Sequence, residues 1–112
     1  MNSYKDIAKD VFSFVGTLSK ENPGIAQGYM TLHKTVTSEG ALSVKEKELI
    51  AIGISINAHC EECLSVHVSA ALEAGASREE IVETIGVAVM MGGGPAIAYG
   101  KRAYDAMMEF SQ

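Results

Sequence analysis

The sequence contains little that would cross-link or stiffen a chain. It has no tryptophan, 2 prolines and 2 cysteines, and aromatic residues make up 6% of its 112 positions. The scarcity of proline, together with a hydrophobic fraction of 47%, excludes a disordered or low-complexity protein. A chain of this length supports one hydrophobic core, so we predict a single domain over residues 1–112.

Positive charge is also scarce, with 9 lysines and arginines against 14 aspartates and glutamates, for a formal net charge of −5. Binding to a phosphate backbone needs a basic face, so we predict no nucleic-acid partner. No apolar run approaches the roughly 18 residues of a membrane span. Residues 1–6 contain no basic segment leading into an apolar one. We therefore predict a cytoplasmic protein with no export signal and no membrane partner.

Helix-start signals recur along the chain. Ser43-Val44-Lys45-Glu46 and Ser77-Arg78-Glu79-Glu80 have the spacing of a capping box. Gly75 suits the left-handed position that ends a helix, and Gly92-Gly93-Gly94-Pro95 separates the last two helices. These signals predict an all-α fold of about six helices. The first helix is predicted from its cap Ser3 to about Leu18, and the second from Pro23, after its cap Asn22, to about Thr35. The third is predicted to begin after its cap Ser43, and the fourth to cover residues 58–74. The fifth is predicted to run from its cap Ser77 to the glycines at 92–94, and the sixth to end at about Phe110.

One segment, Leu49 to Ile56, gives conflicting signals. Its isoleucines recur at every second residue, which is the period of a half-buried strand. The capping box just upstream and the lack of a second convincing strand oppose this interpretation, because a lone strand leaves its backbone donors and acceptors unpaired. We predict a helix that is apolar on every side and therefore buried.

Both cysteines and two of the three histidines lie in the stretch Ala58-His59-Cys60-Glu61-Glu62-Cys63-Leu64-Ser65-Val66-His67. On the predicted fourth helix, with Asn57 as its N-cap, Cys60, Cys63 and His67 share one face. Cys60 then lies in the first turn, where unpaired N–H groups and the helix dipole stabilise a thiolate. His67, four residues after Cys63, is positioned to accept that thiol's proton. The spacing suits a pair of thiols that cycles through a disulfide.

The same residues allow other roles. His59, Cys60, Cys63 and His67 are all potential metal ligands, but a helix does not direct both histidines at one ion, and structural zinc usually takes its second pair of ligands from another segment. The cysteines also suit simple packing. A metal-binding or redox-sensing module is therefore retained as an alternative. Covalent haem is excluded, because Leu64 stands where the attachment motif needs histidine, and we predict no cofactor.

Glu48, followed after eleven residues by Cys60-x-x-Cys63-x-x-x-His67, matches the Glu/CxxC/His signature of alkylhydroperoxidase D-like proteins in the carboxymuconolactone decarboxylase superfamily. The surrounding pattern of caps and glycines is also similar to that family, over roughly residues 20–110. The resemblance implies an all-α, single-repeat domain that assembles as a homotrimer or homohexamer.

The resemblance also implies a thiol-dependent peroxidase or disulfide reductase that acts on a hydroperoxide or a disulfide. In that chemistry Cys63 attacks the hydroperoxide and becomes a sulfenic acid, Cys60 resolves it to a disulfide, and Glu48 and His67 form a proton relay. An external dithiol or redox protein then reduces the disulfide. On the residues alone the attacking thiol stays open, because the helix start favours Cys60 whereas His67 favours Cys63.

The sequence departs from the family between the two cysteines. The best-known peroxidases of the family carry a histidine before the second cysteine, whereas Glu61 and Glu62 fill the gap here. Two carboxylates beside the thiols oppose thiolate formation unless they point into solvent. Founding decarboxylases of the family act on a lactone without this cysteine pair, so a lyase is the second choice.

The remaining features predict packing rather than chemistry. His59 is expected to support the site or to be exposed, and His33 to be a solvated helix residue. Tyr99 and Tyr104 are expected to anchor a subunit interface or to be half-buried. An apolar stripe at helical spacing in the fifth helix is expected to be core, and comprises Ile81, Val82, Ile85, Val89, Met90 and Met91.

Overall fold

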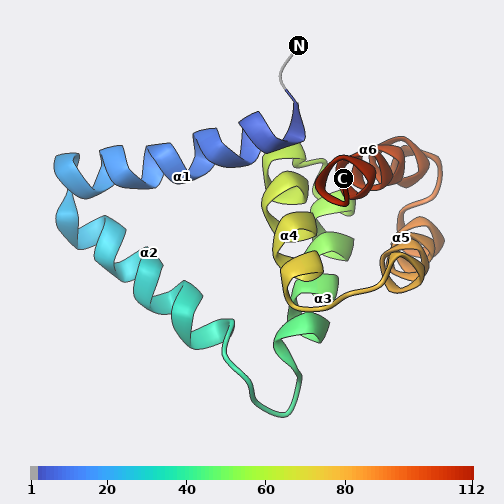
Figure 1. Ribbon diagram of the computed structural model, residues 1–112, viewed down its shortest axis with the longest axis horizontal. Coiled ribbons are helices and arrows are strands. Elements are labelled where there is room, and N and C mark those ends of the chain that lie inside the picture. The colour runs from blue at the N-terminus through green and yellow to red at the C-terminus, as the bar shows by residue number, and fades with distance from the viewer. Residues whose placement is uncertain (1–2) are drawn as a thin grey trace.

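The computed structural model describes residues 3–112, which form six α-helices and no strand (Figure 1). The predicted all-α fold with six helices is confirmed. Met1 and Asn2, which begin the segment predicted to lack an export signal, lie outside the described residues. In chain order the helices are α1 (Tyr4–Glu21), α2 (Pro23–Val36), α3 (Val44–Asn57), α4 (Glu61–Glu73), α5 (Arg78–Gly92) and α6 (Gly94–Phe110).

Side-chain caps explain where the first two helices begin. Ser3 Oγ accepts a hydrogen bond from the N–H of Asp6 at 3.1 Å, and Asn22 Oδ1 accepts one from the N–H of Ile25 at 3.2 Å. Each bond satisfies a backbone donor that the first turn of a helix leaves free. Both predicted caps are therefore confirmed, although α1 and α2 end slightly later than predicted.

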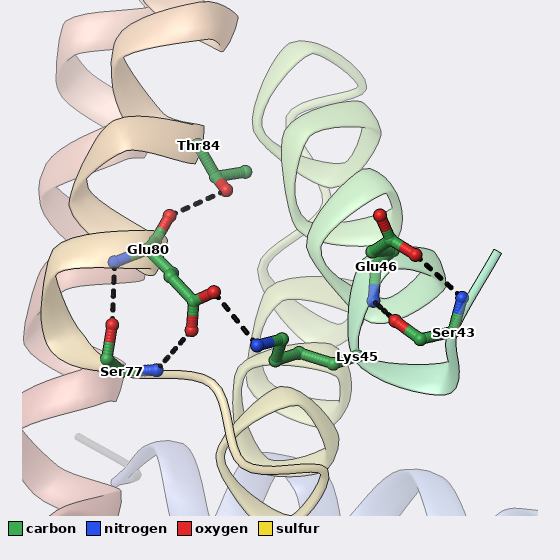
Figure 2. Close-up of polar contacts among 6 residues, drawn as sticks. All are labelled: Ser43, Lys45, Glu46, Ser77, Glu80 and Thr84. Carbon is green, nitrogen blue, oxygen red and sulfur yellow. Dashed lines mark hydrogen bonds and ion pairs between the residues drawn. The ribbon is translucent and has the colours of Figure 1, made fainter.

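Both predicted capping boxes are present, and an ion pair connects them (Figure 2). The N–H of Ser43 donates to Glu46 Oε1 at 2.7 Å, and the N–H of Ser77 donates to Glu80 Oε1 at 2.8 Å. These backbone bonds hold the pKa of Glu46 and the pKa of Glu80 below the usual value of 4.5. Lys45 Nζ lies 3.0 Å from Glu80 Oε2, so the start of α3 is joined to the start of α5.

Helices α3 to α6 form the body of the molecule, with α3 and α4 packed against each other (Figure 1). α3 also packs against α5 and α6, and α4 packs against α6. Burying one large aliphatic side chain in such a core stabilises the fold by about 1.5–3 kcal/mol. A Cβ atom at Gly100 would lie 2.8 Å from Ile85 Cγ2, so glycine allows α6 to approach α5 closely. The buried apolar side chains of the core are Ile52, Ile56, Leu64, Val68, Ala71, Ala76, Ile81, Ala88, Ala96, Ala103, Ala106 and Met107.

Helices α1 and α2 form an arm that projects from the body (Figure 1). α1 packs against α4 and α6, and the N–H groups of Tyr4 and Lys5 donate to the Glu109 carboxylate at 3.1 and 2.8 Å. Among the helices of residues 3–112, α2 packs only against α1. Each arm helix buries one residue, Ala8 in α1 and Ala26 in α2. The arm therefore leaves most of its apolar side chains exposed.

The isoleucine-rich segment of α3 is helical, as predicted, but it is not buried on every side. Ile52 and Ile56 are fully buried, whereas Ile50 and Ile54 are 49% and 66% exposed. Residues two apart on a helix point to nearly opposite sides, so alternating isoleucines divide into a buried pair and an exposed pair. The prediction of a fully buried helix is therefore wrong for the exposed pair.

The apolar stripe of α5 divides in the same way. Ile81 is buried and two further members pack against the core, as predicted, whereas the other three are exposed, contrary to prediction. Residues of α3 and α5, including the exposed Ile50, Ile54 and Met91, line an apolar groove of about 650 Å³. Within the part of the chain that the structure describes, no helix combines the length and the apolar character that crossing a membrane requires.

Candidate active site

The two cysteines lie at the junction of α3 and α4 and form a disulfide there. α3 continues to Asn57 and α4 begins only at Glu61, so Cys60 is the N-cap residue of α4 and not part of its first turn. Cys60 Sγ accepts the N–H of Cys63 at 3.2 Å, as a serine oxygen would at an N-cap. The predictions that Asn57 caps this helix and that it begins at residue 58 are therefore wrong.

The left-handed backbone of His59 explains this shifted boundary. With a φ of 55°, His59 ends α3 and turns the chain, so that the next helix starts two residues later. Asn57 instead donates its side-chain amide to the Ala88 carbonyl at 3.2 Å, which joins α3 to α5. Cys60 still faces the free N–H groups at the start of α4, where a thiolate is stabilised.

Glu48 of α3 and His67 of α4 form the second part of the candidate site. Glu48 Oε1 lies 2.7 Å from His67 Nδ1, and the two side chains are 6% and 24% exposed. A carboxylate at one ring nitrogen orients an imidazole and directs proton transfer to the other nitrogen. His67 lies one turn after Cys63 on the same face of α4. The fold thus brings together two residues that are 19 positions apart in sequence.

An apolar gap between the arm and the body lies beside the Glu48–His67 pair. It has a volume of about 350 Å³, and α2 forms its opposite wall. His33 and Tyr29 lie on this wall, with their ring centroids 5.9 Å apart. His33 is exposed, as predicted, but it also lines the gap. Sequence reasoning missed both residues, because only their spacing of four connects them and nothing local places α2 opposite α3.

A stack of three side chains adjoins the first cysteine. The ring of His59, the residue before Cys60, lies parallel to that of Tyr99, with an interplanar angle of 9° and centroids 4.5 Å apart. The Arg102 guanidinium lies 4.3 Å from the centroid of the same tyrosine ring. His59 is exposed and Tyr99 is half-buried, both within what was predicted. Tyr104 is exposed, with 39% of its surface accessible, so the prediction that it is half-buried is wrong, and its place in a subunit interface stays a prediction.

The two glutamates between the cysteines differ in their surroundings. Arg102 Nη1 lies 3.8 Å from Glu61 Oε2, so a cation offsets this carboxylate. Glu62 is exposed, and water screens its charge. Both effects weaken the repulsion that these carboxylates exert on a thiolate at the start of α4.

The four sequence candidates for metal ligands are divided between different contacts. Cys60 and Cys63 are bonded to each other, His67 contacts Glu48 and His59 stacks on Tyr99. Over residues 3–112, no three side chains of His, Cys, Asp or Glu are grouped so that they could hold a metal ion.

These features define an all-α protein with a CxxC disulfide at a helix start and, on the two helices that meet there, a buried glutamate paired with a partly buried histidine. Residues 23–106 match the model of the Carboxymuconolactone decarboxylase family. The chain belongs to this family, and the resemblance noted from the Glu/CxxC/His spacing is confirmed at the level of the superfamily.

Relatives of this chain match most of its length. An uncharacterized protein from Cupriavidus necator is 33% identical over 95 residues, which cover 82% of this chain and 84% of that protein. An uncharacterized protein from the cox locus of Paracoccus denitrificans is 34% identical over 95 residues, which cover 85% and 86% of the two chains.

Solved structures have the same fold. The apo form of a carboxymuconolactone decarboxylase family protein from Legionella pneumophila superposes with a TM-score of 0.94 at 38% identity, over 97% of both chains. A family protein from Thermotoga maritima, for which an involvement in the antioxidative response has been suggested, superposes with a TM-score of 0.83 at 26% identity, over 95% of this chain and 90% of that one.

Proposed function

We propose that this protein is a thiol-dependent peroxidase or disulfide reductase that uses Cys60 and Cys63 as its redox pair. The observation that carries the proposal is the Cys60–Cys63 disulfide at the start of α4, one turn before His67 and its partner Glu48. A helix start stabilises thiolates, and a carboxylate–imidazole pair moves protons, so the two halves of the site supply complementary chemistry.

In the proposed reaction the Cys63 thiolate attacks the terminal oxygen of a hydroperoxide. The O–O bond breaks, Cys63 becomes a sulfenic acid, and the alkoxide leaves as an alcohol after taking a proton. The Cys60 thiol then attacks the sulfenic sulfur, which forms the disulfide and releases water. The thiols lose two electrons and the hydroperoxide gains them. With a disulfide substrate, thiol–disulfide exchange transfers the same two electrons.

Glu48 and His67 would serve as the proton relay in this cycle. His67 is four residues after Cys63, so its imidazole is on the correct face of α4 to accept the thiol proton and to pass a proton to the leaving oxygen. Glu48, which is almost fully buried, holds the ring through Nδ1. Buried carboxylates that orient a histidine in this way are typical of sites that transfer protons.

Cys60 has a different part in the proposed cycle. As the N-cap of α4, its sulfur accepts the Cys63 N–H, so negative charge on Cys60 is stabilised where the disulfide opens. An external dithiol or redox protein would attack Cys63, release the Cys60 thiolate and then take the remaining sulfur into its own disulfide. A reducing compartment such as the cytoplasm would supply this reductant.

Family membership supports a second candidate, a lyase that resembles the decarboxylases for which the family is named. Such an enzyme would use Glu48 and His67 for acid–base chemistry and would not need the thiols. Alkylation of both cysteines separates the two candidates, because it would abolish a thiol peroxidase and leave a lyase active.

We also propose that the protein assembles as a homotrimer or homohexamer. Soluble monomers rarely expose apolar patches larger than a few hundred Å². This chain exposes large apolar side chains on two regions, the arm and the face of α3 and α5, and a repeated subunit would cover both. They are Phe12, Phe14, Ile25, Tyr29, Met30, Leu32 and Val36 on the arm, and Ile50, Ile54, Val82, Val87, Met90 and Met91 on the body.

The proposed activity is tested by following peroxide consumption in the presence of a dithiol reductant. The parent protein should consume organic hydroperoxide catalytically, and Cys63→Ser should lose this activity. Cys60→Ser is the matched control, since it should retain one round of oxidation at Cys63 without forming the disulfide. Peroxide consumption by Cys63→Ser at the parent rate would disprove the mechanism.

A further inference from the structure

Two helices of this protein end in the same backbone arrangement. At the end of α4, Gly75 N–H donates to the Leu72 carbonyl at 3.0 Å and Ala76 N–H donates to the Ala71 carbonyl at 2.9 Å. This pair of bonds is the Schellman motif, in which one residue takes a left-handed conformation. Gly75 takes it here, with a φ of 94°. Glycine is the usual choice, because it has no Cβ atom to clash.

The end of α3 repeats the motif with a histidine in the glycine position. His59 N–H donates to the Ile56 carbonyl at 3.2 Å, and Cys60 N–H donates to the Ser55 carbonyl at 3.1 Å. His59 is the one residue other than glycine with a positive φ within residues 3–112. A side chain in this conformation is uncommon and carries a strain that its surroundings must offset.

The stack on Tyr99 supplies the contact that offsets this strain. The rings of His59 and Tyr99 are nearly parallel with centroids 4.5 Å apart, and Arg102 packs against Tyr99 as well. Tyr99 belongs to α6 and packs against the core, so it is a fixed surface for the exposed imidazole. The stack thus ties the turn between α3 and α4 to a third helix.

Cys60, the residue after His59, takes part in both the end of α3 and the start of α4. Its N–H closes the Schellman motif of α3, and its sulfur caps α4. Any rotation of the His59 backbone therefore displaces Cys60 relative to Cys63. The restraint on His59 keeps the first sulfur within reach of the second.

We propose that His59 and Tyr99 are positioning residues that set the thiol–disulfide equilibrium of the CxxC pair. This inference rests on the proposed redox function of that pair. Holding Cys60 beside Cys63 raises the effective concentration of one thiol at the other, which favours the disulfide. Loss of the stack lets the turn move when the disulfide opens, and so favours the dithiol form.

The test is an equilibration of the protein with glutathione and glutathione disulfide. Two glutathione thiols reduce the protein disulfide to the dithiol and become one glutathione disulfide, so the fraction of oxidised protein gives the equilibrium constant. Tyr99→Leu removes the aromatic surface and should shift this constant about five-fold toward the dithiol. Tyr99→Phe is the matched control, because it keeps the ring, and should stay within about two-fold of the parent.

A substitution at His59 tests the same contact from the other side. His59→Gly accepts the left-handed conformation but loses the stack, and it should shift the constant in the same direction as Tyr99→Leu. Because both substitutions remove one contact, the double variant should shift no further than either single variant. Urea unfolding of each variant in the reduced state detects a purely structural role, which would lower stability and leave the glutathione constant unchanged.

Two results would overturn the inference, and they are distinguishable. In the first, the parent cycles between dithiol and disulfide, and Tyr99→Leu and His59→Gly have the same equilibrium constant with glutathione as the parent. The positioning role is then wrong, and the proposed function stands. If the parent thiols never form the disulfide in oxidising glutathione buffer, the proposed redox function fails and the positioning role fails with it.

Discussion

The arm helices α1 and α2 bury one residue each, Ala8 and Ala26, whereas α3 and α4 bury four residues each. The difference does not come from a lack of apolar side chains, because the arm carries Phe12, Phe14 and Leu32, all more than 60% exposed. The apolar residues of the body are largely buried in the core of the chain, whereas those of the arm are exposed and available for contacts with another molecule.

The candidate site lies where these two regions face each other. Glu48 and His67 belong to the body, and α2 of the arm forms the opposite wall of the gap that they line. The closely packed helices α3 and α4 fix the geometry of the Glu–His pair, while the loosely packed arm determines how open the gap is. This contrast predicts that substitutions in the two regions will have different signatures.

The largest effect is expected from a substitution in the centre of the body. Leu64 is fully buried in α4, and Leu64→Ala should lower the free energy of unfolding by about 2–5 kcal/mol, because it leaves a cavity beside the α3–α4 interface. Leu32→Ala in the arm is the matched control, with 64% of its surface exposed. Urea unfolding of the dilute protein measures both. Equal losses in the two variants would contradict the division into arm and body.

A slightly smaller effect is expected at the Glu–His pair. Glu48→Gln keeps the shape of the side chain but removes its charge, so His67 loses the carboxylate that orients its ring for proton transfer. Peroxide turnover should fall by about 100-fold, the lower limit of what acid–base catalysis contributes. Glu46→Gln, two residues earlier in α3 and exposed, should leave turnover unchanged. Parent-like turnover in Glu48→Gln would remove the pair from the mechanism.

A substitution on the exposed face of the arm tests whether this face mediates assembly of the oligomer. Leu32→Asp introduces a charge where a neighbouring subunit is proposed to pack, and burial of an unpaired carboxylate is costly. The concentration at which the oligomer dissociates should rise at least about ten-fold, as measured by sedimentation. Ser19→Asp, an exposed position near the end of α1, is the control and should assemble like the parent. Unchanged assembly of Leu32→Asp would place the interface elsewhere.

The smallest effect is expected from the capping boxes that begin α3 and α5. Because the folded-state pKa values of Glu46 and Glu80 lie below 4.5, their carboxylates add stability above pH 4.5 and lose it as the pH falls through the lowered values. A variant with Glu46→Gln and Glu80→Gln keeps side chains that can complete both boxes but cannot titrate. Its urea midpoint should change less than the parent's between pH 5 and pH 3. An identical acid dependence would contradict the assignment.

Much of the fold was predictable because the residues that start its helices act over only a few positions of sequence. Ser3, Asn22, Ser43 and Ser77 cap helices through bonds to residues three positions away, and these bonds are encoded within one turn of sequence. The boundary at Asn57 was mispredicted because a histidine occupies the left-handed position where a glycine would have been recognised. Its partner Tyr99 is forty residues away, and no local pattern connects the two.

The candidate site was predictable only in part, for a similar reason. The spacing of Cys60, Cys63 and His67 is visible in the sequence, and family resemblance added Glu48. The wall formed by Tyr29 and His33 depends on how α2 lies relative to α3, which long-range packing determines. The exposure of Ile50 and Ile54 depends in the same way on which side of α3 meets its neighbours.

The central claim is that Cys63 is oxidised first and Cys60 then closes the disulfide. Intact mass measured after the reduced protein meets one equivalent of hydroperoxide tests this most directly. The parent should lose two hydrogen atoms as the disulfide forms, Cys60→Ser should gain one oxygen atom at Cys63, and Cys63→Ser should stay unchanged. Gain of oxygen by Cys63→Ser as fast as the parent loses hydrogen would contradict the account, because it would make Cys60 the attacking thiol.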